Sequence, residues 1–167
     1  MDPIETSTTS STVAGDLTPT HSIIDPLAEQ RCPTPPIETA PWPGNTYIIR
    51  HPASGRQITL IRGELSLEYH MGDQGGYHWK CVETDGWLGF CDPVHATYMG
   101  SDFRGGIQSK VMHHKSCEHF CARRHPGGGY ILLRRDGHAL MKMKVGEDGR
   151  KLVETKGEGT PWEFVKV

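Results

Sequence analysis

The feature that constrains the fold most is a pattern of strand and turn residues that occurs three times along the chain. Its copies begin at Tyr47, Trp87 and Tyr130, at intervals of 40 and 43 residues. Each copy opens on an aromatic residue followed by Ile or Leu, meets a turn built from Asp, Pro or Gly, and resumes with a pair of apolar residues. A repeat of this length is typical of a supersecondary unit that occurs several times in one domain.

Each copy is expected to hold four short strands. In the middle copy, Asp85-Gly86 separates two apolar runs, 78–82 and 87–90, and an Asp-Gly pair in this setting predicts a tight hairpin. Leu65, Ile107 and Leu152 take equivalent positions in the third strands. The third strands are expected at residues 63–69, 105–111 and 149–156, and the fourth strands at residues 78–82, 118–122 and 162–167.

Three units of this kind predict a closed β-trefoil. A period near 40 residues also fits a propeller blade, but a propeller needs at least about four blades. Three four-stranded units that share one core can close on themselves, which leaves no long edge strand free to pair with another chain. The expected fold is therefore all-β, a β-trefoil of three four-stranded repeats.

Residues 1–43 are expected to form a disordered Ser/Thr/Pro-rich tail, and residues 44–167 the trefoil domain. The tail has no sustained hydrophobic period and no aromatic residue before Trp42. It therefore buries too little apolar surface to offset the entropy of ordering. Residues 1–42 hold six acidic residues against one arginine, a net charge of −5, whereas the remainder holds 17 basic and 14 acidic residues, a net charge of +3.

The composition favours a cytoplasmic protein. The chain contains no run of about 18 apolar residues that would span a membrane. Its first residues have neither the basic start nor the apolar core of a secretory signal. The five cysteines are odd in number and are most simply read as free thiols of a reducing compartment, although a bridge between Cys81 and Cys91 remains open.

The repeat also carries a resemblance to a known family. The middle unit, with Trp87-Leu88-Gly89 before the turn and Tyr98-Met99-Gly100 after it, resembles the fascin-type, actin-crosslinking trefoil. Residues 79–100, 119–133 and 162–164 resemble small single-domain fungal proteins of that kind, and the resemblance covers about residues 45–167. It implies a trefoil fold and an actin-like protein as one candidate partner. Fascin proper has several trefoils, so a single one implies few binding sites.

The densest group of chemically versatile side chains lies at residues 113–125, which read HHKSCEHFCARRH. On a strand, Cys117, His119 and Cys121 would share one face, with Phe120 pointing into the core. Thiolate and imidazole are the ligands that zinc prefers, so these three residues are candidate metal ligands. The segment lacks the paired Cys-x-x-Cys spacing of strong zinc sites, and a strand separates such side chains by nearly 7 Å. No cofactor is expected, and zinc is the lesser hypothesis.

Two arginine pairs flank the glycine-rich turn at residues 125–129, and we expect them to gather at one end of the barrel. Together with Lys142, Lys144, Arg150 and Lys151 they would form a basic patch, although a solvated charged face is the alternative. The candidate ligand-binding residues are His113, His114, His119, His125, Arg123, Arg124, Arg134 and Arg135.

The function that these observations favour is a noncatalytic binding module, which recognises a protein or a small polar ligand through its barrel-end loops. No nucleophile elbow, phosphate loop or zinc-protease motif is present. One alternative is a small noncanonical enzyme of fungal secondary metabolism that uses residues 113–125. A lectin-like trefoil is a further alternative, although the Gln-x-Trp signature of ricin-type trefoils is replaced at residues 77–79, 118–120 and 160–162. Nucleic acid is not favoured, because the chain is near neutral and has no nucleic-acid-binding motif.

Overall fold

The computed structural model describes residues 39–167, and within them the chain is built from short strands and two 3-10 turns. The strands are β1 (Thr46–Arg50), β2 (Gln57–Ile61), β3 (Glu64–Glu68), β4 (Trp79–Thr84), β5 (Trp87–Asp92), β6 (Thr97–Ser101), β7 (Ile107–Val111), β8 (Phe120–Arg124), β9 (Tyr130–Asp136), β10 (Ala139–Val145), β11 (Leu152–Thr155) and β12 (Pro161–Lys166). The 3-10 turns are η1 (Gly72–Gln74) and η2 (Ser116–Glu118). None of these residues forms a helix long and apolar enough to cross a membrane.

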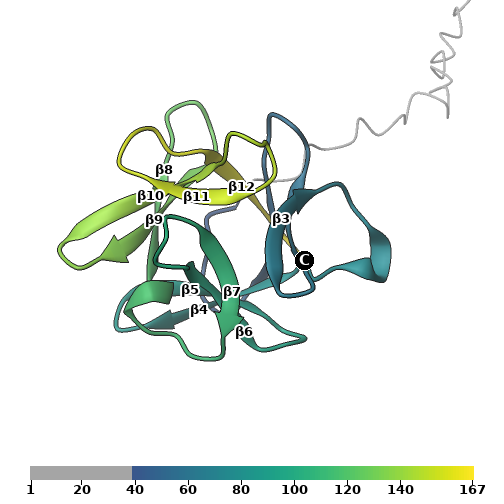
Figure 1. Cartoon of the computed structure of the whole chain (residues 1–167), viewed down its shortest axis with the longest axis horizontal. Coiled ribbons are helices and arrows are strands. Elements are labelled where there is room, and N and C mark those ends of the chain that lie inside the picture. Colours follow the sequence, from purple (N-terminus) through teal and green to yellow (C-terminus); the bar gives the residue numbers. More distant parts are fainter. Residues whose placement is uncertain (1–38) are drawn as a thin grey trace, which may run out of the picture. The chain divides into compact units, whose positions relative to one another are not determined.

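Six of the strands close into a barrel. Antiparallel pairing runs from β1 to β4, β5, β8, β9 and β12, and β12 pairs back with β1. The other six form three hairpins, β2–β3, β6–β7 and β10–β11, which meet one another (Figure 1). Backbone bonds tie the hairpins together, from Leu67 N to Arg150 O at 2.8 Å and from Glu154 N to Gly105 O at 2.8 Å. This is a β-trefoil of three four-stranded repeats, as the sequence predicts.

The register of the barrel strands shows which residues of the three units are equivalent. Cross-strand partners are Tyr47 and Trp79 in the first unit, Leu88 and Phe120 in the second, and Tyr130 and Trp162 in the third. The prediction that Trp87 is equivalent to Tyr47 is therefore wrong by one residue. Side chains alternate between the two faces of a strand, so this slip moves Trp87 from the core to the outer face.

The core lies inside this barrel and beneath the hairpins. Trp79, Phe120 and Trp162 are each fully buried, which confirms that Phe120 points inward. Burial of a side chain such as Phe120 contributes roughly 1.5–3 kcal/mol to stability. The indole Nε1 of Trp79 also donates a hydrogen bond of 3.0 Å to the carbonyl of Ile58. Leu65, Ile107 and Leu152, predicted to be equivalent, are all buried where the hairpins meet the core.

The Asp85-Gly86 pair forms the tight turn between β4 and β5. Both residues have positive φ, 53° and 81°, as a two-residue hairpin of this type requires. The β2–β3 turn has the same form, with φ of 51° at Arg62 and 83° at Gly63. Arginine is an unusual residue at such a position, because its Cβ is strained where φ is positive.

The predicted tail falls largely outside the described residues. Of its residues 39–43, Thr39 N donates to the carbonyl of Phe164 at 3.2 Å, and Trp42 N donates to the Tyr47 hydroxyl at 2.9 Å. Cys32 lies outside the described range. Cys81 and Cys91 are free thiols and are not cross-strand partners, because Cys81 pairs with Phe90.

Candidate functional site

The candidate binding residues of the 113–125 segment do not form one site. Strand β8 separates them, with His119 before its first residue and His125 after its last. A rise of about 3.3 Å per residue puts these two histidines roughly 20 Å apart along the chain. The structure thus creates two groups, a basic cleft at the end of β8 and a stack of rings at its start.

The basic cleft has a volume of about 310 Å³ and lies between the β8–β9 turn, β10 and the β11–β12 loop. Arg123, Arg124 and Lys142 supply its cationic groups. Its complete lining is Arg123, Arg124, His125, Pro126, Ile131, Leu133, Lys142, Glu158 and Gly159. The cleft thus combines cations at its edge with the buried side chains of Ile131 and Leu133 at its floor, and a single carboxylate, Glu158.

Local contacts hold the groups of the basic cleft in place. The Arg124 guanidinium lies 6.0 Å from the centre of the Tyr130 ring, within the range of a cation–π contact. The Lys142 Nζ donates to the carbonyl of Gly157 at 2.9 Å, and the backbone N–H of Gly127 donates to His125 Nδ1 at 3.1 Å. Gly159 packs closely on the floor, since a Cβ there would lie 2.9 Å from Ile131 Cγ2.

Part of this cleft was predicted from the sequence. Arg123, Arg124, His125 and Lys142 were among the predicted binding or basic-patch residues, whereas Glu158, Gly159 and the apolar floor were not. Glu158 and Gly159 lie about 35 residues beyond Arg123 in the chain, and no local pattern links them to the arginines. The repeat offered one signal. Residues 158–160, which precede Trp162, are equivalent to residues 116–118, which precede Phe120 and lie in the predicted binding segment 113–125.

The stack of rings lies at the start of β8. His119 stacks on Trp87, with ring centroids 5.9 Å apart and planes 7° apart, and meets the His114 ring edge-on at 4.9 Å. His114 in turn stacks on Tyr98 at 5.5 Å. The Arg135 guanidinium lies 5.6 Å from the centre of the Trp87 ring. Two of the candidate histidines and one candidate arginine thus form one continuous group.

The two histidines of this stack have different environments. His114 is bound through both ring nitrogens, Nδ1 to Thr84 Oγ1 at 2.8 Å and Nε2 to the carbonyl of Leu88 at 3.2 Å. His119 is 7% exposed, and neither of its ring nitrogens has a hydrogen-bond partner within residues 39–167. Burial lowers the pKa of His119, and the nearby His114 and Arg135 lower it further. His119 is therefore expected to be neutral at physiological pH.

The geometry assumed for a zinc site at Cys117, His119 and Cys121 is wrong. Cys117 lies in the 3-10 turn η2 and only Cys121 lies in β8, so the three side chains do not share a strand face. Residues 39–167 contain no group of three or more His, Cys, Asp or Glu side chains close enough to hold a metal ion. Burial also raises the pKa of Cys121, which disfavours the thiolate that zinc requires. The remaining histidine of the segment, His113, lies 3.8 Å from Glu118 Oε2.

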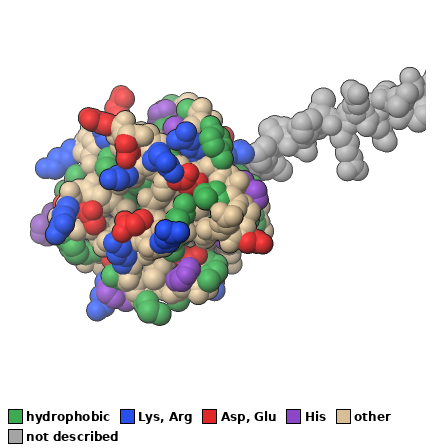
Figure 2. Space-filling view, turned by 45° about the vertical axis from the view of Figure 1, so that its right-hand side comes forward, with side chains coloured by type: hydrophobic (Ala, Val, Ile, Leu, Met, Phe, Trp, Pro, Cys, Tyr) green, Lys and Arg blue, Asp and Glu red, His purple; other side chains and the backbone are tan. Residues whose placement is uncertain are grey.

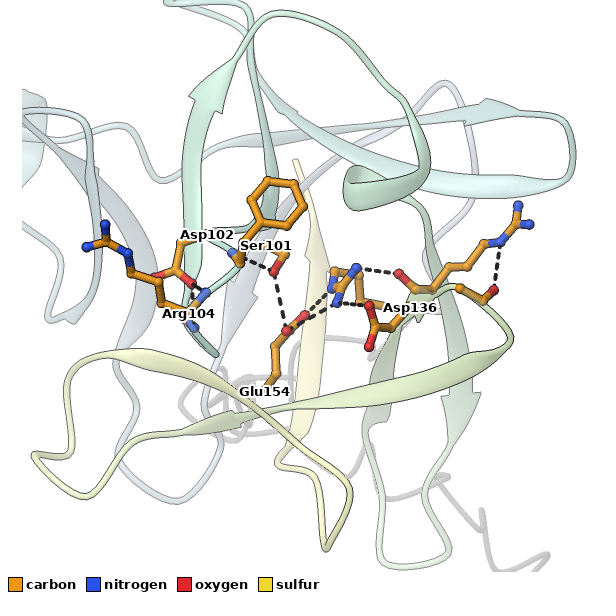
Figure 3. A network of polar contacts seen from close by, with 10 residues as sticks. Ser101, Asp102, Arg104, Asp136 and Glu154 are labelled. Carbon is orange, nitrogen blue, oxygen red and sulfur yellow. Dashed lines mark hydrogen bonds and ion pairs between the residues drawn. The ribbon is translucent and has the colours of Figure 1, made fainter.

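Arg134 belongs to neither group, because it is 5% exposed and its guanidinium is already paired. It donates to both carboxylate oxygens of Glu154 and lies 3.4 Å from Asp136 Oδ1. Glu154 also accepts from Ser101 Oγ at 3.4 Å, so it lies between Ser101 and the guanidinium (Figure 3). Burial alone would lower the pKa of Arg134, but these carboxylates raise it above its usual value.

The wider basic patch is also divided. Arg150 forms an ion pair with Glu68, away from the basic cleft. On the face drawn in Figure 2, cationic and anionic side chains are interspersed. On this face, therefore, no patch of cationic side chains alone is seen.

No protein-family model matches the chain, and no curated protein matches it. Solved structures do match. The Rhizoctonia solani agglutinin matches with a TM-score of 0.59 and 14% identity, over 77% of this chain and 99% of its own. The Macrolepiota procera ricin B-like lectin in complex with lactose gives 0.51 and 15%, over 77% and 91%. The GlcNAcα1-4Gal-releasing endo-β-galactosidase from Clostridium perfringens gives 0.65 and 14%, over 74% of this chain but 32% of that enzyme.

These likenesses define the class of the protein as a β-trefoil. This chain spans about one third of the length of the galactosidase, so it is similar to one part of that enzyme. At these identities the comparisons establish the fold, and the function has to be argued from the residues of the site.

Proposed function

We propose that the protein is a noncatalytic binding module that holds a small polar, anionic ligand in the basic cleft. The observation that carries this proposal is the convergence of Arg123, Arg124 and Lys142 on one cavity with an apolar floor. Its volume of about 310 Å³ lies at the lower end of the range for ligand pockets. That size suits a ligand of one or two sugar rings.

The chemistry of the lining suggests how such a ligand is held. The two guanidinium groups and the Lys142 ammonium donate hydrogen bonds to carboxylate or sulfate oxygens. Glu158 accepts hydrogen bonds from hydroxyl groups, which an acidic saccharide carries beside its charge. Ile131 and Leu133 offer an apolar surface to the C–H face of a sugar ring. An acidic saccharide therefore matches all three kinds of lining group.

The named neighbours support the lectin form of this proposal. Two of the three structures described above are named as an agglutinin and a lectin, and one of these was solved with lactose. The ricin-type Gln-x-Trp signature plays no part in it, because residues 77–79, 118–120 and 160–162 lack that signature. The basic cleft would therefore be a sugar site specific to this chain.

The proposal is tested by titrating the full chain with an acidic and a neutral disaccharide in a calorimeter. Saturable binding of the acidic sugar is expected, and the double variant Arg123→Gln/Arg124→Gln is expected to weaken it at least tenfold. Arg104→Gln serves as the matched control, since Arg104 is also exposed but lies in the β6–β7 turn. Equal binding by the wild type and the double variant would contradict the proposal.

A protein partner is the second candidate, and the fascin-type resemblance suggests it. Val94, Phe103 and Met112 are 78%, 81% and 72% exposed, but they lie in three separate loops, and single exposed apolar side chains are ordinary on a protein surface. The fascin-type resemblance names an actin-like partner inside the cell, so co-sedimentation with actin filaments is the assay. Absence of the chain from the filament pellet would contradict this candidate.

A further inference from the structure

A second cavity, lined by the β2–β3 turn, the β5–β6 turn and β7, has chemistry that the proposed function does not use. Its volume is about 280 Å³. Its lining is Leu60, Arg62, Gly63, His95, Thr97, Ser109 and Lys110. None of these residues was among the predicted binding residues, and none lines the basic cleft.

His95 is held in this cavity by a buried carboxylate. The Asp92 side chain is 1% exposed, and its Oδ2 lies 2.7 Å from His95 Nδ1 and accepts the His95 backbone N–H at 2.8 Å. The backbone bond by itself would shape the turn. The additional bond to Nδ1 fixes the ring, so that Nε2 is the nitrogen left for a ligand. The His95 side chain is 64% exposed, and a ligand in the cavity can reach it.

The hydroxyl groups of the cavity are arranged to donate. Ser109 is buried, and its Oγ donates to Thr97 Oγ1 at 2.9 Å. Because Thr97 accepts that bond, its own O–H is free to donate into the cavity. The structure therefore presents one hydroxyl donor beside the His95 ring.

Two cations complete the lining. Lys110 Nζ lies 2.6 Å from Glu64 Oε1. Both side chains are largely exposed, 49% and 71%, so this ion pair is weak, and a bound anion can replace Glu64 as the partner of Lys110. Arg62 is exposed at the tip of the β2–β3 turn. The cationic groups at the cavity are thus Arg62 and Lys110, the titratable His95 lies between the two turns, and the carboxylates of Glu64 and the buried Asp92 oppose the cations.

The backbone beside this cavity is strained at two places. Arg62 has a φ of 51°, and Ala96, between His95 and Thr97, has a φ of 56°. Residues other than glycine adopt such values only at a free-energy cost. At Arg62 the positive φ is that of the tight β2–β3 turn, as at Asp85 in the β4–β5 turn, and at Ala96 it belongs to the β5–β6 turn. The two turns place Arg62 and His95 on either side of one cavity.

We propose that this cavity binds a tetrahedral oxyanion, the phosphate or sulfate group of a small ester. Arg62 and Lys110 supply the opposing charge, Thr97 donates through its hydroxyl, and His95 in its imidazolium form donates through Nε2–H while Asp92 holds Nδ1–H. Asp92 is a positioning residue that acts through His95. The site is separate from the basic cleft and does not depend on the identity of the ligand there.

The test is a heteronuclear NMR titration of the full chain with inorganic phosphate and, separately, with sulfate, at constant ionic strength set by chloride. Saturable shifts are expected at the amides of Gly63, Thr97 and Ser109. Arg62→Asn is expected to weaken binding at least tenfold. Asparagine tolerates a positive φ, so this variant removes the charge and preserves the turn. His95→Gln should also weaken binding, whereas Arg104→Gln should not.

Three results would overturn the inference. The first is a set of shifts that grow linearly with phosphate and sulfate and do not saturate. The second is binding by Arg62→Asn that equals that of the wild type while its amide spectrum remains folded. The third is loss of phosphate binding in Arg123→Gln/Arg124→Gln, which would place the anion in the basic cleft and so support the proposed function alone. Preference for phosphate over sulfate would identify which ester the cavity selects.

Discussion

The buried ion pair between Arg134 in β9 and Glu154 in β11, both in the third unit, gives the most direct test of what burial of a charge pair contributes to the stability of this fold. Replacing Arg134 with Met keeps an unbranched apolar stem but removes the guanidinium and its charge. The Glu154 side chain is 7% exposed, and it would then retain only the 3.4 Å contact with Ser101 Oγ. Removing one partner of such a buried pair typically costs about 3–5 kcal/mol, because an uncompensated charge stays in the interior.

The assay is urea denaturation of the purified chain, followed by tryptophan fluorescence. With a loss near 3 kcal/mol and a slope of about 2 kcal/mol per molar urea, the midpoint should fall by about 1.5 M. Glu154→Leu should cost less, because Arg134 keeps Asp136 at 3.4 Å. The double variant should recover most of the loss, since it leaves no buried charge.

The matched control is Arg150→Met, which removes the ion pair between Arg150 and Glu68. The Arg150 side chain is 58% exposed, and Glu68 keeps the hydrogen bond that Ser66 Oγ donates to it at 2.7 Å, so only a small change in the midpoint is expected. A midpoint for Arg134→Met no lower than that of Arg150→Met would refute the argument that burial determines the value of this pair.

Three further predictions concern the stack of rings and the core. Gly89→Ala should destabilise the protein by about 1–3 kcal/mol in urea, because a Cβ would lie 2.5 Å from His114 Nε2. Adding His114→Ala should reverse part of that loss. Strictly additive losses of the two variants would contradict the contact. Burial lowers the pKa of His119, so its contribution to stability is complete above its unfolded pKa of about 6.5 and is lost as the pH falls below that value. His119→Phe should therefore flatten the fall in thermal midpoint between pH 7 and pH 5, and an unchanged slope would contradict this assignment. Burial raises the pKa of Cys81 to about 12, so iodoacetamide should modify this thiol far more slowly in the native chain than in urea. Peptide mass spectrometry measures the rate, and equal rates in the two conditions would contradict the burial of Cys81.

The comparison of sequence and structure is most instructive at the second unit. The spacing of the repeats predicted the number of units, the four strands of each and the equivalent core positions Leu65, Ile107 and Leu152. The predicted alignment of the second unit is wrong by one residue. Trp87 resembles Tyr47 in residue type, but Leu88 occupies the position equivalent to Tyr47. Residue type alone does not fix register when an aromatic residue stands on either face of a strand.

The prediction of one binding and metal segment at residues 113–125 depended on regular strand geometry. The 3-10 turn η2 interrupts that geometry at Ser116–Glu118, so Cys117 leaves the face that was assigned to it. The alternation rule holds only inside a strand, and no residue pattern in this segment marks Phe120 as the start of the strand.

The sequence by itself determined the architecture, because a threefold repeat of strand-forming segments around shared apolar positions has few ways to bury them other than a closed trefoil. Only the tertiary structure decided the sites. It brought Glu158 and Lys142 to Arg123, buried Arg134 beside Glu154, and placed Arg62 beside His95. The first and third of these groups combine residues of different units, whereas Arg134 and Glu154 lie on two strands of the third unit. Their meeting depends on how barrel closure and hairpin packing arrange distant turns in space, and short-range patterns in the chain do not encode those distances.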